Sequence, residues 1–258
     1  MLKRLLVCTA LSAVVFPTMA LTAGDLAFTS FNAAEDGWSM VALADISANS
    51  TIFFSDNEWN GSAIGSGGAF NSGESFSQWL TGAAQINAGT VIRFSKVDSP
   101  TLLAASVGTF SRATVSGSTN WGVSQTADTV YAFEGTSASA PTVFIAAVTN
   151  QAGGAFSDTA QGILANTGLT AGSTAIALPG ATGFSQYVGP RATEASFGAY
   201  QASVNNVANW LPSLGGATLA NVVPDTTAFT ITAVPEPSGY ALMLAGFAAV
   251  GFAARRRA

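Results

Sequence analysis

Short runs in which hydrophobic and polar residues alternate recur along the middle of the chain and predict β-strands. In residues 90–97, Ile92 and Phe94 fall on one face, and charged or hydroxyl side chains fall on the other. Residues 228–232 follow the same alternation. Further candidate strands lie at residues 26–31, 38–46, 51–55, 129–133, 142–149 and 174–178.

The same pattern defines the expected fold class. Residues 40–44 are apolar on both faces, as expected of a central strand that is covered on both sides. Turn-rich pieces such as residues 60–73 separate the runs, and a helical spacing is found only around residues 75–84 and 200–210. Many short strands joined by such turns predict an all-β body, an antiparallel β-sandwich, with seventeen Phe and five Trp available for its core.

The first 23 residues depart from this pattern and predict a secretory signal peptide. Two basic residues precede an apolar stretch at residues 5–16, and small residues then offer a cleavage site after Ala20 or after Ala23. The first of these sites fits better. The alternative is an uncleaved membrane anchor, although the stretch is short for a span of about 20 apolar residues.

The other end of the chain predicts a transmembrane helix. Residues 239–254 carry no charge. As a helix they would reach about 24 Å, which local thinning and snorkelling can extend across a hydrocarbon core of about 30 Å. By the positive-inside rule, the basic residues that follow keep the tail in the cytoplasm and the body outside it. These residues are Arg255, Arg256 and Arg257.

A proline-rich segment precedes this stretch and completes a three-part tail. Its residues are Val234, Pro235, Glu236, Pro237 and Ser238. In this order and at this position, the tail resembles the PEP-CTERM sorting signal of Gram-negative bacteria that make exopolysaccharide. The resemblance implies recognition by an exosortase, a membrane-embedded transpeptidase-like enzyme, with cleavage near the Pro-Glu-Pro segment. The alternative is a plain tail anchor.

The two ends therefore predict three parts: a signal peptide at residues 1–23, an extracytoplasmic β-sandwich domain at residues 24–233, and a sorting and anchor segment at residues 234–258. We expect an exported chain that is anchored in the inner membrane as an intermediate. It would then reach the cell surface or the extracellular matrix.

Charge and composition narrow the chemistry of the middle part. It holds four Lys and Arg against thirteen Asp and Glu, a net charge near −9, which argues against nucleic acid and anionic lipid as partners. The chain has no His, and its one Cys, Cys8, lies in the predicted signal peptide. Catalysis by His or Cys, and zinc sites built from them, are therefore excluded in the mature protein.

Carboxylates remain as candidate catalytic groups. Asp56, Glu58 and Glu74 could supply the paired acids of a glycoside hydrolase, which act about 5–10 Å apart. Trp59 and Trp79 could then stack on sugar rings. The alternative, which the sequence favours, is that the acids are solvated loop residues and the tryptophans belong to the core.

A calcium site is the other interpretation of these residues. Ca²⁺ takes six to eight oxygen ligands, and four oxygen-bearing side chains follow the strand predicted at residues 51–55. They are Asp56, Asn57, Glu58 and Asn60, with Glu35 and Asp36 as further contributors if an adjacent hairpin brings them close. Calcium is the one cofactor that the sequence suggests.

Residues 24–28 and 52–59 are similar to segments of bacterial surface domains with a lamin-tail-like sandwich, a resemblance that brings no catalytic motif. Taken together, the sequence predicts a non-enzymatic surface or exopolysaccharide-matrix protein with a structural or adhesive β domain. The alternatives are a carbohydrate-active enzyme and a calcium-dependent glycan-binding module.

Overall fold

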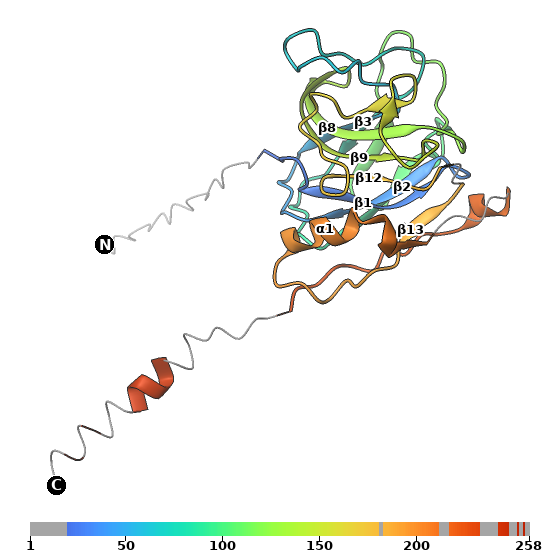
Figure 1. The fold of residues 1–258 in the computed structure, drawn as a ribbon. Coiled ribbons are helices and arrows are strands. Elements are labelled where there is room, and N and C mark those ends of the chain that lie inside the picture. The colour runs from blue at the N-terminus through green and yellow to red at the C-terminus, as the bar shows by residue number, and fades with distance from the viewer. Residues whose placement is uncertain are drawn as a thin grey trace, which may run out of the picture.

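The computed structural model describes residues 20–180, 183–211, 217–232, 242–247, 252 and 255. Strands dominate the body and form two six-stranded sheets that pack face to face (Figure 1). The predicted signal helix and most of the sorting segment lie outside the described residues. Among the residues described, no helix is long and apolar enough to cross a membrane.

The first sheet is antiparallel throughout, in the order β14-β13-β1-β2-β5-β6. Its central strand β2 lies between β1 and β5, as the two apolar faces of residues 40–44 predict. The bounds of its strands are β1 (Leu26–Asn32), β2 (Gly37–Ala42), β5 (Val91–Ser95), β6 (Ala104–Ala105), β13 (Ser185–Tyr187) and β14 (Trp210–Leu211).

The second sheet has the order β12-β9-β8-β3-β4-β7 and is mixed, because β12 pairs with β9 in parallel. The prediction of a purely antiparallel sandwich is wrong at this one pair. Its strands are β3 (Thr51–Ser55), β4 (Phe76–Leu80), β7 (Thr109–Arg112), β8 (Thr129–Ser137), β9 (Ala140–Thr149) and β12 (Ala175–Ala177). A small separate hairpin consists of β10 (Ser157–Asp158) and β11 (Gly162–Ile163).

The main core lies between the two sheets. Phe94 of the first sheet meets Phe54 of the second at 4.9 Å between ring centroids, and Trp38 lies 5.2 Å from Phe54. Burying each such side chain stabilises the fold by roughly 1.5–3 kcal/mol. Alternation along β3 sends Phe54 into this core and Phe53 to the outer face of the second sheet.

That outer face carries a second hydrophobic core. Phe133 and Phe144 of β8 and β9 pack there against Trp59 and Phe70 from the loop between β3 and β4. Because both faces of the sheet are covered, its strands are buried on both sides, as β8 illustrates over Thr129–Phe133.

The C-terminal part of the body packs against the side of the first sheet formed by β14, β13 and β1. In Figure 1, α1 and β13 lie beside β1. The helical elements are η1 (Phe197–Ala199), α1 (Tyr200–Val204), η2 (Val207–Asn209) and η3 (Ala217–Asn221). The helical spacing predicted around residues 200–210 is thus confirmed in short form, whereas residues 76–80, predicted as part of a helix, form strand β4.

Candidate functional site

The acids singled out in the sequence meet at one end of the sandwich. Residues 33–36 join β1 to β2, residues 56–58 follow β3, and residues 74–75 precede β4. Residues 123–128 precede β8 at the same end, since the N–H of Val123 donates to Asp36 Oδ1 at 2.6 Å. We call this the acidic end. It carries Glu35, Asp36, Asp56, Glu58, Glu74, Asp98 and Asp128.

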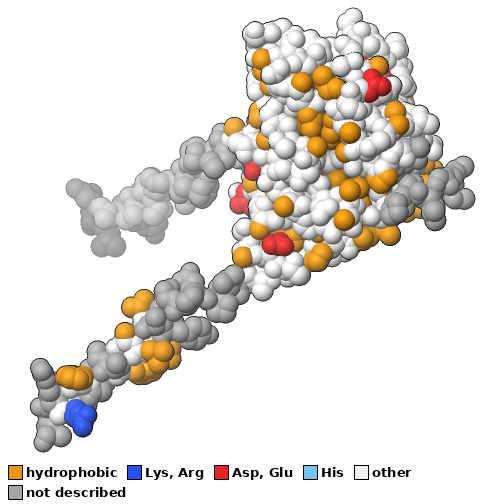
Figure 2. All heavy atoms as spheres, in the orientation of Figure 1, with side chains coloured by type: hydrophobic (Ala, Val, Ile, Leu, Met, Phe, Trp, Pro, Cys, Tyr) orange, Lys and Arg blue, Asp and Glu red, His pale blue; other side chains and the backbone are white. Residues whose placement is uncertain are grey.

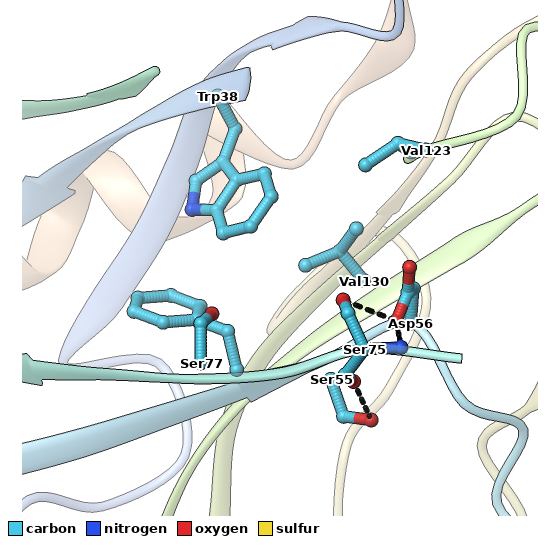
Figure 3. Close-up of a pocket in the computed structure, with 8 residues that line it drawn as sticks. Trp38, Ser55, Asp56, Ser75, Ser77, Val123 and Val130 are labelled. Carbon is cyan, nitrogen blue, oxygen red and sulfur yellow. Dashed lines mark hydrogen bonds between the residues drawn. The ribbon is translucent and has the colours of Figure 1, made fainter. Parts of the chain in front are cut away.

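Asp56 is the most enclosed of these acids, with 3 % of its surface exposed. Its Oδ1 accepts hydrogen bonds from the N–H and the hydroxyl of Ser75, at 2.8 and 2.7 Å (Figure 3). Its Oδ2 has no hydrogen-bond partner among the described residues, and neither has Trp38 Nε1 in the same cavity. The cavity is too small for a water molecule. Burial, and then the charge of Asp128, raise the pKa of Asp56 well above its usual value.

Asp128 is buried beside Asp56, directly before β8. Both of its oxygens accept backbone hydrogen bonds, from Ser124 at 2.8 Å and from Thr129 at 2.7 Å. These bonds favour the ionised form, but burial outweighs them and raises the pKa of Asp128 to about 7, with Glu58 adding repulsion. Asp128 is therefore held in place by the backbone whether or not it is charged.

Two partly buried acids complete the group. Burial raises the pKa of Glu74 to about 7, and the charges of Asp128 and Glu58 add to the shift. Burial also raises the pKa of Asp36 to about 6, against the opposing hydrogen bond from Val123. Four carboxyl groups of the acidic end, those of Asp36, Asp56, Glu74 and Asp128, therefore favour their protonated forms.

The side chains of the four predicted calcium ligands contact different parts of the protein. Asn57 binds the segment before β4, with its Oδ1 accepting from the N–H of Glu74 at 3.1 Å. Asn60 Oδ1 accepts from Ser62 within the following loop, and Glu58 contacts Asn71 at 3.5 Å. Among the described residues, no group of three or more acids is arranged to hold a metal ion. The set Asp56, Asn57, Glu58 and Asn60 stays a prediction.

The two tryptophans that were considered for stacking on sugar rings are core residues. Trp59 and Trp79 are both fully buried, so neither presents a ring to a ligand. Their Nε1–H groups donate to the carbonyls of Ala165 at 3.1 Å and Val107 at 2.7 Å. Both are core residues, the alternative that the sequence favoured.

A hollow of about 470 Å³ lies between β12 and α1, and none of the seven acids of the acidic end lines it. Glycine, alanine and asparagine supply most of its lining, and none of the described residues that line it is charged or aromatic. A site of this composition offers neither a general acid nor a stacking surface.

Sequence reasoning missed Asp128, whose charge raises the pKa of both Asp56 and Glu74. The available signal was its position: Asp128 immediately precedes a predicted strand, much as Asp56 immediately follows one. Only the pairing of β3 with β8 shows that these two positions are neighbours.

Fold and site define an acidic, mostly β protein with two packed sheets. A family model described as the PEP-CTERM protein-sorting motif matches residues 233–257. The chain therefore carries this motif, and the resemblance of Val234–Ser238 and Arg255–Arg257 to the sorting signal is confirmed. The motif implies export, a membrane-anchored intermediate and processing by an exosortase, a membrane enzyme. No curated protein and no solved structure matches the chain.

Proposed function

We propose that this chain is a non-enzymatic protein of the cell surface or exopolysaccharide matrix, delivered through the exosortase pathway, with a structural or adhesive β domain. The observation that carries the proposal is the sorting motif at residues 233–257, directly after the folded body. Exopolysaccharide is the proposed partner of the exported domain. Nucleic acid is not, because the body is acidic.

The environment of the acids supports a structural role. Asp56 is inaccessible and holds the segment before β4, and Asp128 is fixed by two backbone N–H groups. The surface in view in Figure 2 carries few charged side chains among many neutral ones. Such a surface is better suited to binding a neutral polymer than to cleaving it.

The N-terminal boundary of the body supports the signal-peptide prediction. Leu21 is buried with 3 % of its surface exposed and belongs to the main core. Thr22 binds the carboxylate of Asp25 through its N–H at 2.6 Å. Cleavage after Ala20 would leave these contacts intact, whereas cleavage after Ala23 would remove them.

Cell fractionation tests the delivery step. We compare the full chain with one that ends at Ala233, expressed in a host that has an exosortase. The full chain should pass through the membrane fraction and appear later in a shortened form, and the truncated chain should be released without passing through it. Identical fractionation of the two chains would contradict the proposal.

Incubation with the host's exopolysaccharide tests the proposed role of the domain. We expect the truncated chain to sediment with the polymer and to release no reducing sugar. Release of sugar that is lost in Glu58→Gln and kept in Glu194→Gln would establish the carbohydrate-active alternative instead.

A further inference from the structure

The last part of the body crosses the outer face of the first sheet from one end to the other. At the acidic end, the side-chain amide of Asn32 donates to the carbonyl of Val222 at 3.4 Å. At the opposite end, the N–H of Phe229 donates to the carbonyl of Gly89, just before β5, at 2.8 Å. We call residues 222–232 the strap, and the end at which it finishes the strap end.

Phe229 anchors the strap by its ring. The side chain is 2 % exposed and stacks on Tyr187, with 5.7 Å between the ring centroids. Tyr200 meets it edge-on at 4.9 Å, and the guanidinium of Arg191 lies over it at 4.9 Å. Burial, aromatic pairing and a cation–π contact therefore all hold one residue of the strap.

Arg191 also holds the strap backbone. Its side chain, 10 % exposed, donates to the carbonyl of Thr227 at 2.6 Å and to that of Asp225 at 3.3 Å. The same guanidinium lies 3.4 Å from the Asp225 carboxylate. A buried arginine with several acceptors on one segment fixes that segment in place.

This attachment continues to the last residue before the sorting motif. The Tyr200 hydroxyl donates to the carbonyl of Thr230 at 2.7 Å. Thr232 donates its N–H to the carbonyl of Glu194 and its hydroxyl to that of Ala192, both at 2.9 Å. The family match begins at residue 233, so the sorting motif follows the last attached residue of the body directly.

The remaining tether is short compared with the body. Residues 233–238 separate Thr232 from the uncharged stretch, and six extended residues span at most about 21 Å. The nine residues of β8 run from the acidic end toward the opposite end of the sandwich and extend over roughly 30 Å, which is longer than the tether. A body held by this tether can bring the strap end to a membrane but cannot also bring the acidic end there.

We infer that, in the membrane-anchored intermediate, the strap end faces the lipid surface and the acidic end projects away from it. The loops at the strap end are residues 43–50 and 81–90, which meet at the bridge between Ile46 and Ile86. The inference rests on the anchored intermediate of the proposed function.

Site-specific fluorescence in liposomes tests this orientation. The chain has one cysteine, so Cys8→Ser provides a background in which Ala84→Cys labels the strap end and Ser116→Cys labels the acidic end. Both positions are exposed. The full chain is reconstituted into anionic liposomes whose lipid headgroups carry a nitroxide quencher. We expect the label at position 84 to be quenched several-fold more strongly than the label at position 116.

Equal quenching, or stronger quenching at position 116, would overturn the orientation while leaving the anchor intact. A chain that fails to float with the liposomes would instead overturn the anchor itself, and the orientation with it. Flotation thus separates failure of the proposed function from failure of the inference.

A linker variant tests whether the strap and short tether set the orientation. About 40 Gly and Ser residues inserted between Thr232 and Ala233 would span roughly 35 Å on average and leave the strap contacts unchanged. The difference in quenching between the two labels should then disappear. If it persisted undiminished, direct contacts of the body with lipid would set the orientation, and the role of the tether would be disproved.

Discussion

The two ends of the sandwich handle charge in opposite ways. At the acidic end, Asp56 and Asp128 are buried close to each other and favour protonation. Along the strap, Arg191 and Asp225 form an ion pair, and Arg191 also binds the strap backbone. Stability at the acidic end therefore depends on bound protons, whereas attachment of the strap depends on groups that remain ionised.

On the strap, by contrast, the pKa of the acidic residue Asp225 is lowered. Hydrogen bonds from the Thr227 hydroxyl and N–H lower the pKa of Asp225, and Arg191 contributes less. Burial lowers the pKa of Arg191, which stays charged because an arginine in a protein remains protonated. Strap attachment should therefore weaken only when acid protonates Asp225.

The largest predicted effect is that of removing the strap's anchor. Phe229→Ala deletes a buried ring and leaves a cavity between Tyr187 and Tyr200, which should lower the free energy of unfolding by about 3–5 kcal/mol. Chemical denaturation of the body measures this change. Ile231→Ala is the matched control, since Ile231 lies on the same strap and is 47 % exposed.

For this control we expect a change of about 0.5 kcal/mol or less. If both variants lost a similar amount of the free energy of unfolding, the strap would be held along its whole length rather than by the Phe229 ring. Loss of the strap's protection from proteolysis in Phe229→Ala alone would locate the attachment at the ring.

The second prediction concerns pH and the acidic end. The pKa of Asp128 and of Glu74 is raised to about 7 and that of Asp36 to about 6, so as pH rises the unfolded chain loses these protons first. Stability should be fully present below about pH 4 for these groups and decrease until about pH 7. Buried Asp128 alone should lower the free energy of unfolding by roughly 3 kcal/mol between pH 5 and pH 8, and Glu74 and Asp36 should add less than their shifts suggest because solvent partly screens them.

Denaturation at several pH values measures this profile. Stability that rises from pH 5 to pH 8 would show that the acidic end is ionised and stabilised in the fold. Asp225 acts in the opposite sense, but only as pH falls through its lowered pKa, so the two ends affect separate pH ranges.

The sequence predicted those strands in which hydrophobic and polar residues alternate clearly. Residues 51–55 form β3 with the predicted bounds. The strand predicted at residues 38–46 is shorter in the structure, where β2 ends at Ala42. Strand β4 was mistaken for a helix because Ser77, although polar, is buried in the inner face and interrupts the alternation. When both faces of a sheet are covered, the period of two no longer separates polar from apolar residues.

The strap shows the opposite error. Residues 228–232 alternate as a strand should, and Phe229 and Ile231 were predicted to share a face. Instead Phe229 is buried and Ile231 is half exposed, because the segment bonds singly to Gly89, Arg191 and Glu194 rather than to a strand. The acidic end shows a similar limit of local patterns, since Asp128 lies 72 positions from Asp56 in the sequence and next to it in space only through β8.

A third, smaller effect distinguishes the two central acids. Asp128→Asn places a side-chain NH₂ against a backbone N–H, of either Ser124 or Thr129, and should lower the free energy of unfolding by about 1–3 kcal/mol. Asp56→Asn keeps its acceptor for Ser75 and turns its amide toward the position that has no partner among the described residues. This variant should be close to neutral at pH 5 and more stable than the parent at pH 8.

Denaturation at both pH values compares the pair. If Asp56→Asn were destabilising at pH 8, Asp56 would act as a charged group, and the view of the acidic end as a proton-binding cluster would be wrong. Asp158→Asn serves as a control and should leave the pH profile unchanged, because Asp158 is an exposed carboxyl that is not among the charges raising the pKa of Asp36, Asp56, Glu74 or Asp128.

The smallest predicted effect is that of calcium on the acidic end. Asp56, Asn57 and Asn60 already accept hydrogen bonds from protein groups, which leaves fewer of their oxygens for a metal ion. We therefore expect calcium at millimolar concentration to stabilise the fold by less than about 0.5 kcal/mol, whereas a tenfold excess over a dissociation constant would give about 1.4 kcal/mol. Thermal unfolding at about pH 8 measures the shift, with magnesium at equal concentration as the control for screening.

A stabilisation specific to calcium that disappears in Asp56→Asn would establish the site that the sequence suggested. The acidic end would then be a cation-binding surface that projects away from the membrane, and its low stability at neutral pH would be a property of the metal-free protein alone.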